Sequence, residues 1–215
     1  MSTPTRGARR KAQTGAAILD AAEGLFRRQG YAATTLDEIA AVADVSVGSV
    51  YVHFQTKAGL YLALVERALD LNEAAMAQVD AAGLDSPLER VLAAGDAYLD
   101  FHVEHPGAFQ MIALRVLEPA VTTGLSEVEE RVAGRVARLV GAVRDDLQAA
   151  IDAGEIRTDL DADQAMRFLW GAWNGVIALS LRQDDLRVDV TELRQTLAVG
   201  RQLISDGLRA GAAAP

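Results

Sequence analysis

The sequence predicts an all-α protein with an N-terminal helix-turn-helix head of three helices and a C-terminal helical body, about nine helices in total. Three observations support this fold class. Apolar residues recur at intervals of three and four along most of the 215-residue chain. Capping residues and helix breakers divide this pattern into segments of helical length. No stretch alternates apolar and polar residues as a half-buried strand would, and no segment is repeated.

The head is centred on residues 34–57, whose sequence contains two short helical patterns joined by a turn. Thr35 and Glu38 form a capping box at the start of the first helix. Ser46 is suited to cap the second helix. Asp44, in the turn, is expected to adopt the left-handed conformation, which aspartate tolerates better than most residues. Two helices joined in this way can place the second one in a DNA groove.

The second helix of this pair is expected to expose small and polar side chains. Val50 and Phe54 are four residues apart and should face inward. The residues left outside are Val47, Gly48, Ser49, Tyr51 and His53. Such a surface adds little to stability and suits close approach to another molecule. Lys57 opens the next helix, where an ammonium group beside free backbone N–H groups would attract a phosphate.

The run TTLDEIAAVADVSVGSVYVHFQTKAGL resembles the DNA-binding half of the TetR family of bacterial transcriptional regulators. The resemblance lies in the threonine before the second helix, the Tyr-x-His-Phe ending of the third and the Thr-Lys opening of the fourth. Upstream, AILDAAEGLFRRQGYAATT resembles the first helix of that family, and the match covers residues 12–64 without a gap. The chain departs from the family at Val47, where many members have a polar residue, and at Asp44, where glycine is common.

The resemblance also implies roles for residues of the head. The residues similar to phosphate anchors of the family are Thr34 or Thr35, Tyr51, His53 and Lys57. The residues expected nearest the bases are Ser46, Val47, Gly48 and Ser49. Phosphate contacts position a protein on DNA, and base contacts specify the sequence. Because Val47 can meet a thymine methyl group and Ser49 can pair with several bases, we expect weak direct readout supplemented by DNA shape.

Charge is distributed unevenly along the chain, whose formal net charge is −9. Residues 1–57 carry seven basic and five acidic side chains, which leaves a net charge of −11 on the remainder. This asymmetry would orient the N-terminal end toward DNA. The sequence contains no apolar run of membrane-spanning length, no secretory signal and no cysteine. We therefore expect a cytoplasmic protein without a membrane contact, a thiolate metal site or a cofactor.

Three regions are expected: a flexible basic arm at 1–11, a helix-turn-helix DNA-binding domain at 12–57, and a ligand-binding and dimerisation domain at 58–215. The arm is either a solvated tail or a segment that lies along the DNA backbone or minor groove. A first helix at 13–29 should end at Gly30 in the left-handed conformation. Body helices are expected from residue 57 to near residue 83, and at 87–105, 108–117, 126–153, 162–181 and 191–208.

The last two helices of the body carry enough apolar residues to cover more than one face. This composition predicts a homodimer in which these helices pair with their symmetry copies as a four-helix bundle.

A pocket for a small apolar molecule is expected between the body helices. The candidate lining residues are Tyr98, Phe101, His102, Phe109, Met166, Trp170, Trp173 and Asn174. Each is about equally consistent with a packed core, and only Asn174, polar within an apolar helix, indicates more than packing. Asn174 could also form a hydrogen bond across the dimer interface.

Enzyme chemistry finds little support in the sequence. His102, Glu104 and His105 allow a metal site or an acid–base pair, but no third ligand is visible, and a helix C-terminus favours histidine on its own. No phosphate-binding loop, nucleophile elbow or catalytic carboxylate pair is present. The sequence therefore predicts no catalytic residue and no metal.

The resulting interpretation is a DNA-binding transcriptional regulator, and specifically a repressor that leaves a palindromic operator when a small apolar ligand enters the body. Two alternatives remain open. The same head could belong to a protein whose body answers to a protein partner or to no ligand. From another class, the chain could be a helical enzyme or carrier with a vestigial head.

Overall fold

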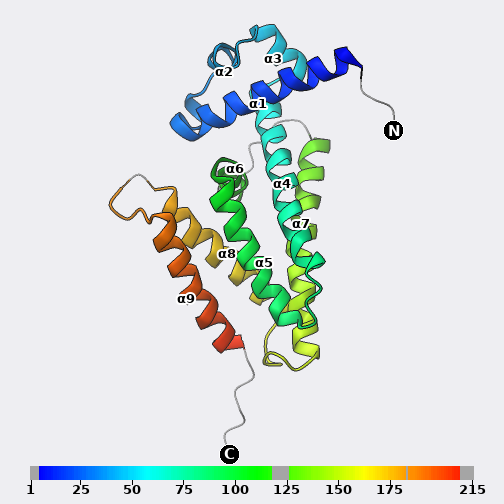
Figure 1. Cartoon of the computed structure of the whole chain (residues 1–215), viewed down its shortest axis with the longest axis vertical. Coiled ribbons are helices and arrows are strands. Elements are labelled where there is room, and N and C mark those ends of the chain that lie inside the picture. The colour runs from blue at the N-terminus through cyan, green and yellow to red at the C-terminus, as the bar shows by residue number, and fades with distance from the viewer. Residues whose placement is uncertain (1–4, 118–125, 183, 209–215) are drawn as a thin grey trace, which may run out of the picture. The chain divides into compact units, whose positions relative to one another are not determined.

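The computed structural model describes residues 5–117, 126–182 and 184–208 of the chain. Over these residues every regular element is a helix, which confirms the predicted fold class (Figure 1). The helices are α1 (Arg6–Ala33), α2 (Leu36–Val42), α3 (Val47–Phe54), α4 (Lys57–Ala81), α5 (Pro87–Glu104), α6 (Pro106–Leu117), α7 (Ser126–Asp152), α8 (Ala162–Ser180) and α9 (Val190–Leu208). None of them, within the described ranges, combines the length and the apolar character that a membrane crossing requires.

The helices pack into two compact units, and each unit combines two segments of the sequence. The head unit contains residues 1–68 and 107–132, and the body unit contains residues 69–106 and 133–215. The division between these compact units falls inside α4, and α6 packs with the head. One reason is the hydrogen bond that Tyr61 on α4 donates to the carbonyl oxygen of Met111 on α6, at 3.2 Å.

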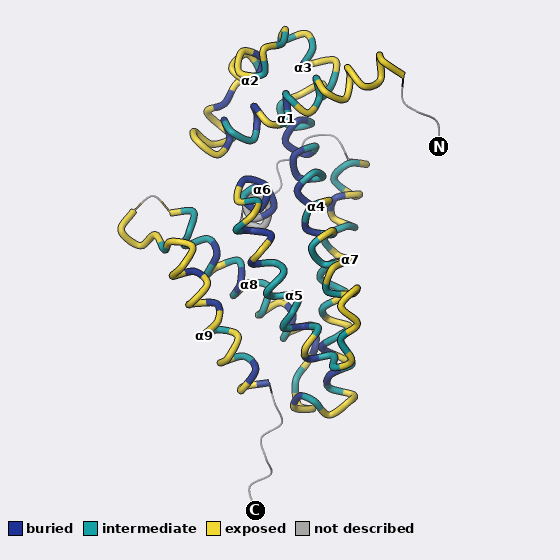
Figure 2. The backbone as a smooth tube through the Cα atoms, viewed as in Figure 1, coloured by how far each residue is buried: buried dark blue, intermediate teal, exposed yellow. Residues whose placement is uncertain are grey.

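Helix α1 begins at Arg6, before the start that the sequence predicts. The hydroxyl of Thr5 accepts a hydrogen bond from the backbone N–H of Ala8 at 3.3 Å and so caps the helix. Residues 6–11 are thus exposed helix rather than an irregular arm (Figure 2). Arginine, lysine and alanine are good helix formers, which accounts for the longer helix. Residues 1–4 of the predicted arm lie outside the described residues.

Helix α1 is interrupted at Gly30, as predicted, but in another conformation. Gly30 has φ 83° and ψ 161°, which is not the left-handed helical region but a region essentially reserved for glycine. A last helical stretch follows to Ala33, and the hydroxyl of Thr34 donates back to the carbonyl oxygen of Gly30 at 2.8 Å. This kink turns the chain toward the start of α2.

The core of the head unit is apolar and is tied together by ion pairs. The almost fully buried side chains include Ile18, Phe26, Ile39, Val50, Leu60 and Leu64. The ring of Tyr61 packs against Phe26 and Tyr31, with centroid distances of 6.3 and 5.3 Å. Arg67 on α4 forms ion pairs with Asp20, at 2.6 Å, and with Glu23 of α1. The first half of α4 is therefore a structural part of the head.

The body unit contains α5, α8 and α9 together with most of α7 and the second half of α4. Its core includes Leu88, Val91, Leu147, Ala150, Ile156, Ala162, Met166 and Leu208. Arg135 of α7 bridges to Asp70 and Glu73 of α4 at 2.6 and 2.7 Å, and its hydrogen bond lowers the pKa of the Glu73 carboxyl group. Helices α8 and α9 lie side by side and keep exposed outer faces (Figures 1 and 2).

Candidate nucleic-acid interface and ligand cavity

The turn between α2 and α3 has the geometry that its sequence predicts. Thr35 caps α2: its hydroxyl accepts from the N–H of Glu38 at 3.2 Å, and the Glu38 carboxylate accepts from the N–H of Thr35 at 2.8 Å. The bond from the backbone N–H of Thr35 lowers the pKa of the Glu38 carboxyl group most, and the Thr35 hydroxyl, which donates to the same carboxylate at 2.9 Å, lowers it further. Asp44 has φ 53°, the expected left-handed conformation. Ser46 then caps α3 by accepting from the N–H of Ser49 at 3.2 Å.

The exposed face of α3 carries no formal charge. Val50 is buried against the head, while Gly48 and Tyr51 are exposed, the latter to 53%. Val52 is 75% exposed, more than any other large apolar side chain of α3, and the sequence interpretation did not include it. Its position four residues after Gly48 could have placed it on this face. An exposed valine beside a glycine and a phenol forms a surface that can approach another molecule closely.

Two residues predicted as phosphate anchors lie below this surface. The side chain of Thr34 is 1% exposed, and its hydroxyl is bonded to Gly30, so it does not face solvent. The ring of His53 packs toward α1, where a Cβ atom added at Gly15 would lie 3.2 Å from its Nδ1 atom. This contact places the end of α3 beside Gly15, and the turns of α1 that precede Gly15 carry the exposed basic side chains Arg9, Arg10 and Lys11. The basic first turns of α1 thus extend the candidate interface.

Lys57 holds the end of α1 in place. Its ammonium donates hydrogen bonds to the carbonyl oxygens of Tyr31, Ala32 and Thr34, at 2.9, 3.3 and 2.9 Å. It also lies 4.5 Å from the centroid of the Tyr31 ring, in a cation–π arrangement. All three donors of the ammonium group therefore already have acceptors, and a phosphate contact would require Lys57 to give up one of them.

This arrangement predicts a stability defect for Lys57→Met. The substitution keeps much of the apolar stem but leaves three carbonyl oxygens without their donor, so the free energy of unfolding of the head should fall by about 2 kcal/mol. Urea denaturation and amide hydrogen exchange at residues 31–34 would measure the loss. Lys11→Met is the control, because Lys11 is the other lysine of the chain and is exposed. This variant should leave both measurements unchanged. Weakened DNA binding without lost stability would instead support the phosphate-anchor role.

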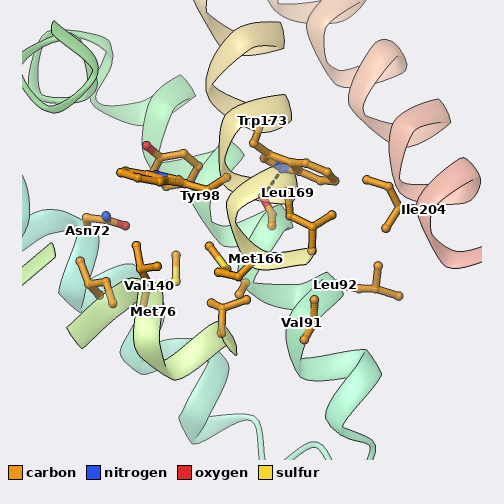
Figure 3. A pocket seen from close by; sticks show the side chains of 15 residues that line it. Asn72, Met76, Val91, Leu92, Tyr98, Val140, Met166, Leu169, Trp173 and Ile204 are labelled. Carbon is orange, nitrogen blue, oxygen red and sulfur yellow. Dashed lines mark hydrogen bonds between the residues drawn. The ribbon is translucent and has the colours of Figure 1, made fainter. Parts of the chain in front are cut away.

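The body unit contains an apolar cavity of about 100 Å³. Its walls come from α4, α5, α7, α8 and α9, as Figure 3 shows for the labelled side chains. The lining residues are Asn72, Met76, Val91, Leu92, Ala94, Gly95, Tyr98, Leu139, Val140, Val143, Met166, Leu169, Trp170, Trp173 and Ile204. Four of the eight residues proposed from the sequence are among them: Tyr98, Met166, Trp170 and Trp173. The contributions of α4 and α7 were not anticipated, because their apolar positions read equally well as core.

The other four proposed residues do not line this cavity. Phe109 is buried in the head unit. Phe101 is buried in the body. Asn174 lies behind the cavity wall: its Oδ1 atom accepts from the Tyr98 hydroxyl at 3.1 Å, and its Nδ2 atom donates to the carbonyl oxygen of Trp170 at 2.8 Å. Both ends of its amide are therefore satisfied within one chain.

Aromatic residues of the cavity wall are held in place by hydrogen bonds. The indole N–H of Trp173 donates to the carbonyl oxygen of Gly95 at 3.1 Å. A Cβ atom at Gly95 would lie 3.1 Å from the Trp173 ring, so glycine allows the indole to lie against α5. Burial raises the pKa of the Tyr98 hydroxyl to about 12, and its hydrogen bonds with Asn174 and Trp170 only partly offset this effect. Tyr98 is thus a neutral part of the wall.

His102 is buried in the body unit and forms a hydrogen bond with α8. It is 3% exposed, and its Nε2 atom lies 2.9 Å from the hydroxyl oxygen of Ser180. Ser180 donates its own proton to the carbonyl oxygen of Ile177 at 2.7 Å, so Nε2 of His102 is the donor of the shared bond. His105 caps the end of α5. In the described part of the chain, no three His, Cys, Asp or Glu side chains are placed to hold a metal ion.

The chain combines a helix-turn-helix, whose second helix exposes uncharged side chains, with a larger helical body that contains an apolar cavity, and this combination is typical of a DNA-binding regulator. Comparison with known proteins agrees. Residues 18–64 match the model of the bacterial regulatory proteins of the tetR family, and residues 122–197 match the tetracyclin repressor-like C-terminal domain. The chain belongs to the TetR family and is a DNA-binding transcriptional regulator.

Individual relatives agree with this family. The transcriptional regulator TcmR of Streptomyces glaucescens is 30% identical over 192 residues, which cover 86% of this chain and 78% of TcmR. The transcriptional repressor KstR2 of Rhodococcus jostii is 29% identical over 154 residues, 71% of this chain and 72% of that protein. The structure of the TetR family regulator PfmR from Thermus thermophilus has a TM-score of 0.72 and 21% identity, covering 98% of this chain and all of PfmR. That structural similarity supports the fold.

Proposed function

We propose that this regulator is a homodimeric repressor that binds a palindromic operator through α3 and releases it when a small apolar ligand enters the body cavity. The observation that carries the proposal is α4, one unbroken helix from Lys57 to Ala81. Its first turn holds the end of α1 through Lys57, and its second half contributes Asn72 and Met76 to the cavity wall. A ligand that moves the second half of α4 therefore acts on an element of the DNA-binding head.

The proposed DNA contacts follow the exposure of the head. Gly48, Val47, Ser49 and Val52 form the surface that would meet base edges, with Ser46 and Thr35 at the helix starts beside the backbone. Tyr51 would bind a phosphate through its exposed hydroxyl group. The basic turns of α1 would add contacts that depend on salt but not on sequence. Lys57 and Thr34 would support this surface from below rather than touch DNA.

Tyr51→Phe is expected to weaken binding to every duplex by a similar factor, about fivefold, because it removes one hydrogen bond to a phosphate and no base contact. Fluorescence anisotropy on an operator fragment and on an unrelated duplex, at two salt concentrations, would measure this factor. Val52→Ala is the matched control on the same face, and its effect should depend on sequence. A loss confined to the operator in Tyr51→Phe would assign the residue to base readout instead.

Dimerisation is proposed through the outer faces of α8 and α9. Phe168 on α8 and Val199 and Leu203 on α9 are apolar and more than half exposed. Gly171 and Gly175 have open space above them and would let another helix approach closely. A symmetric pair would present two copies of α3, and these must lie about one DNA turn, roughly 34 Å, apart to enter successive major grooves.

Repression and ligand release are supported by the cavity and by the relatives. KstR2 of R. jostii and SCO4008 of Streptomyces coelicolor are named repressors, the latter 26% identical over 91% of this chain and 89% of that protein. The structure of the similar protein AibR contains isovaleryl coenzyme A and operator DNA. The cavity in this chain offers no cationic side chain for coenzyme A phosphates, so an uncharged ligand fits it better. An open cavity also favours a ligand over a body that is packed solid.

The proposal is tested by selecting genomic fragments with the purified protein. The protein is expected to retain a small set of fragments that share a palindrome. On these fragments the bound protein should protect two half-sites in successive major grooves. Retention should end when a small apolar compound is added that quenches tryptophan fluorescence. A protein that retains no duplex at low ionic strength would contradict the DNA-binding role. Retention that no cavity-binding compound reverses would contradict ligand release alone.

A further inference from the structure

The cavity wall contains one polar side chain that the protein itself does not satisfy. Asn72 on α4 is 6% exposed, and its Oδ1 atom is buried without a hydrogen-bond partner among the described residues. Figure 3 shows its carboxamide directed toward the other lining side chains, on the same side of the view as Tyr98. The other polar wall groups are engaged: the Tyr98 hydroxyl with Asn174 and Trp170, and the Trp173 N–H with Gly95. Asn72 is therefore the exception in an apolar wall.

A buried amide oxygen without a partner is costly. Leaving such a group unsatisfied costs about 1–3 kcal/mol, and most buried polar groups in native proteins are paired. A leucine has nearly the shape of asparagine and would fill the position without this cost. A water molecule needs two to four polar partners to be held, and the surrounding side chains are almost all apolar. These features indicate that the partner of Asn72 is part of the ligand.

Charge and size restrict that ligand further. The lining side chains include no acid and no base, so a charged ligand group would be desolvated without a counterion. A carboxamide offers a donor and an acceptor but no charge, which suits a hydroxyl, carbonyl or amide group. The cavity of about 100 Å³ compares with about 150 Å³ for an apolar cavity that holds benzene, so a ring-sized molecule needs little displacement of the walls.

We propose that the cavity takes an uncharged, largely apolar ligand with one polar group, and that the Asn72 carboxamide binds this group. The inference rests on the proposed function and names the ligand class for its cavity. It also places the polar contact on α4, the helix that continues into the head. A ligand recognised in this way bonds directly to the element that would transmit its presence.

The test compares benzyl alcohol with ethylbenzene, which has a methyl group where the alcohol has a hydroxyl group. Their dissociation constants are measured by calorimetry for the unchanged protein and for Asn72→Leu, and the ratio of the two constants cancels the difference in hydrophobicity between the compounds. The preference for the alcohol should fall about fivefold in Asn72→Leu, the value of one hydrogen bond. Without ligand, Asn72→Leu should be at least as stable as the unchanged protein, since it buries no unsatisfied amide.

The outcomes separate this inference from the proposed function. An unchanged preference in Asn72→Leu, or benzoate binding as tightly as benzyl alcohol, would overturn the ligand class and leave a cavity-binding regulator intact. If neither compound binds either protein, both the inference and ligand release fail. Retention of operator fragments is measured in the same samples. If the alcohol binds with the expected dependence on Asn72 but releases no fragment, the ligand class stands and release by these compounds is wrong.

Discussion

Leu203→Glu is expected to convert the protein to a monomer and to lower its affinity for a palindromic operator by about 100-fold or more. Leu203 is 68% exposed on α9, Val199 one turn earlier is 61% exposed, and Phe168 on the neighbouring α8 is 68% exposed. Exposed apolar side chains of this kind indicate an interface. In a two-fold symmetric dimer each substitution occurs twice, so two carboxylates would be buried without partners. A monomer binds only one half-site and loses the avidity of the pair.

Light scattering after size exclusion would give the mass, and anisotropy on the selected operator would give the affinity. Ala137→Glu, which adds the same charge at an exposed position of α7, is the matched control and should remain dimeric. Circular dichroism should be unchanged in both variants because neither position is buried in the single chain. A Leu203→Glu protein that stays dimeric would assign the interface to another face. A monomer that binds the operator with full affinity would show that operator binding does not require a symmetric dimer.

The fold was predictable because its boundaries depend on local chemistry. Thr35, Ser46, Ser86 and Asp161 cap α2, α3, α5 and α8 through side-chain oxygen atoms, and these bonds involve residues only three apart. The left-handed conformation of Asp44 follows from the same short-range rules. The grouping of α6 with the head could not be predicted in this way, because it depends on contacts such as Tyr61 to Met111, fifty residues apart.

The candidate sites were predictable only in part, for the same reason. The exposed character of α3 follows from helical periodicity, which places Val50 inside and Tyr51 outside. The role of Lys57 does not follow from helical periodicity, because the carbonyl oxygens that accept its hydrogen bonds precede it by 23 to 26 residues. Asn72 could not be singled out, because an asparagine in an amphipathic helix reads as a solvated residue until the helices on either side of it are known.

The body unit should lose stability in mild acid, and His102 should be the main cause above pH 4.5. Burial lowers the pKa of the His102 imidazole from 6.5 to about 4. Folding therefore favours the neutral form of His102. The folded state has its full stability with respect to this group above pH 6.5, and it loses stability as the pH falls toward 4, because the unfolded chain then binds a proton that the folded chain does not. The expected loss is at most about 3 kcal/mol, from 1.36 kcal/mol for each unit of pKa difference. Protonation would also place a charge in the contact between α5 and α8, where His102 meets Ser180.

Urea denaturation of the body at a series of pH values between 7 and 4.5 would measure this dependence. His102→Gln should flatten it, although its stability at pH 7 is lower, while His105→Gln should keep the slope because His102 is still present. Carboxyl groups with lowered pKa values, such as Glu73 bonded to Arg135, stabilise the folded state at every pH above about 4.5, which is their pKa in the unfolded chain. This stabilisation is lost only below that pH, so these groups do not make stability depend on pH between 7 and 4.5. An equal slope in His102→Gln would show that the buried imidazole is already accessible to protons in the folded body, and the contact between α5 and α8 would then be looser than its burial indicates.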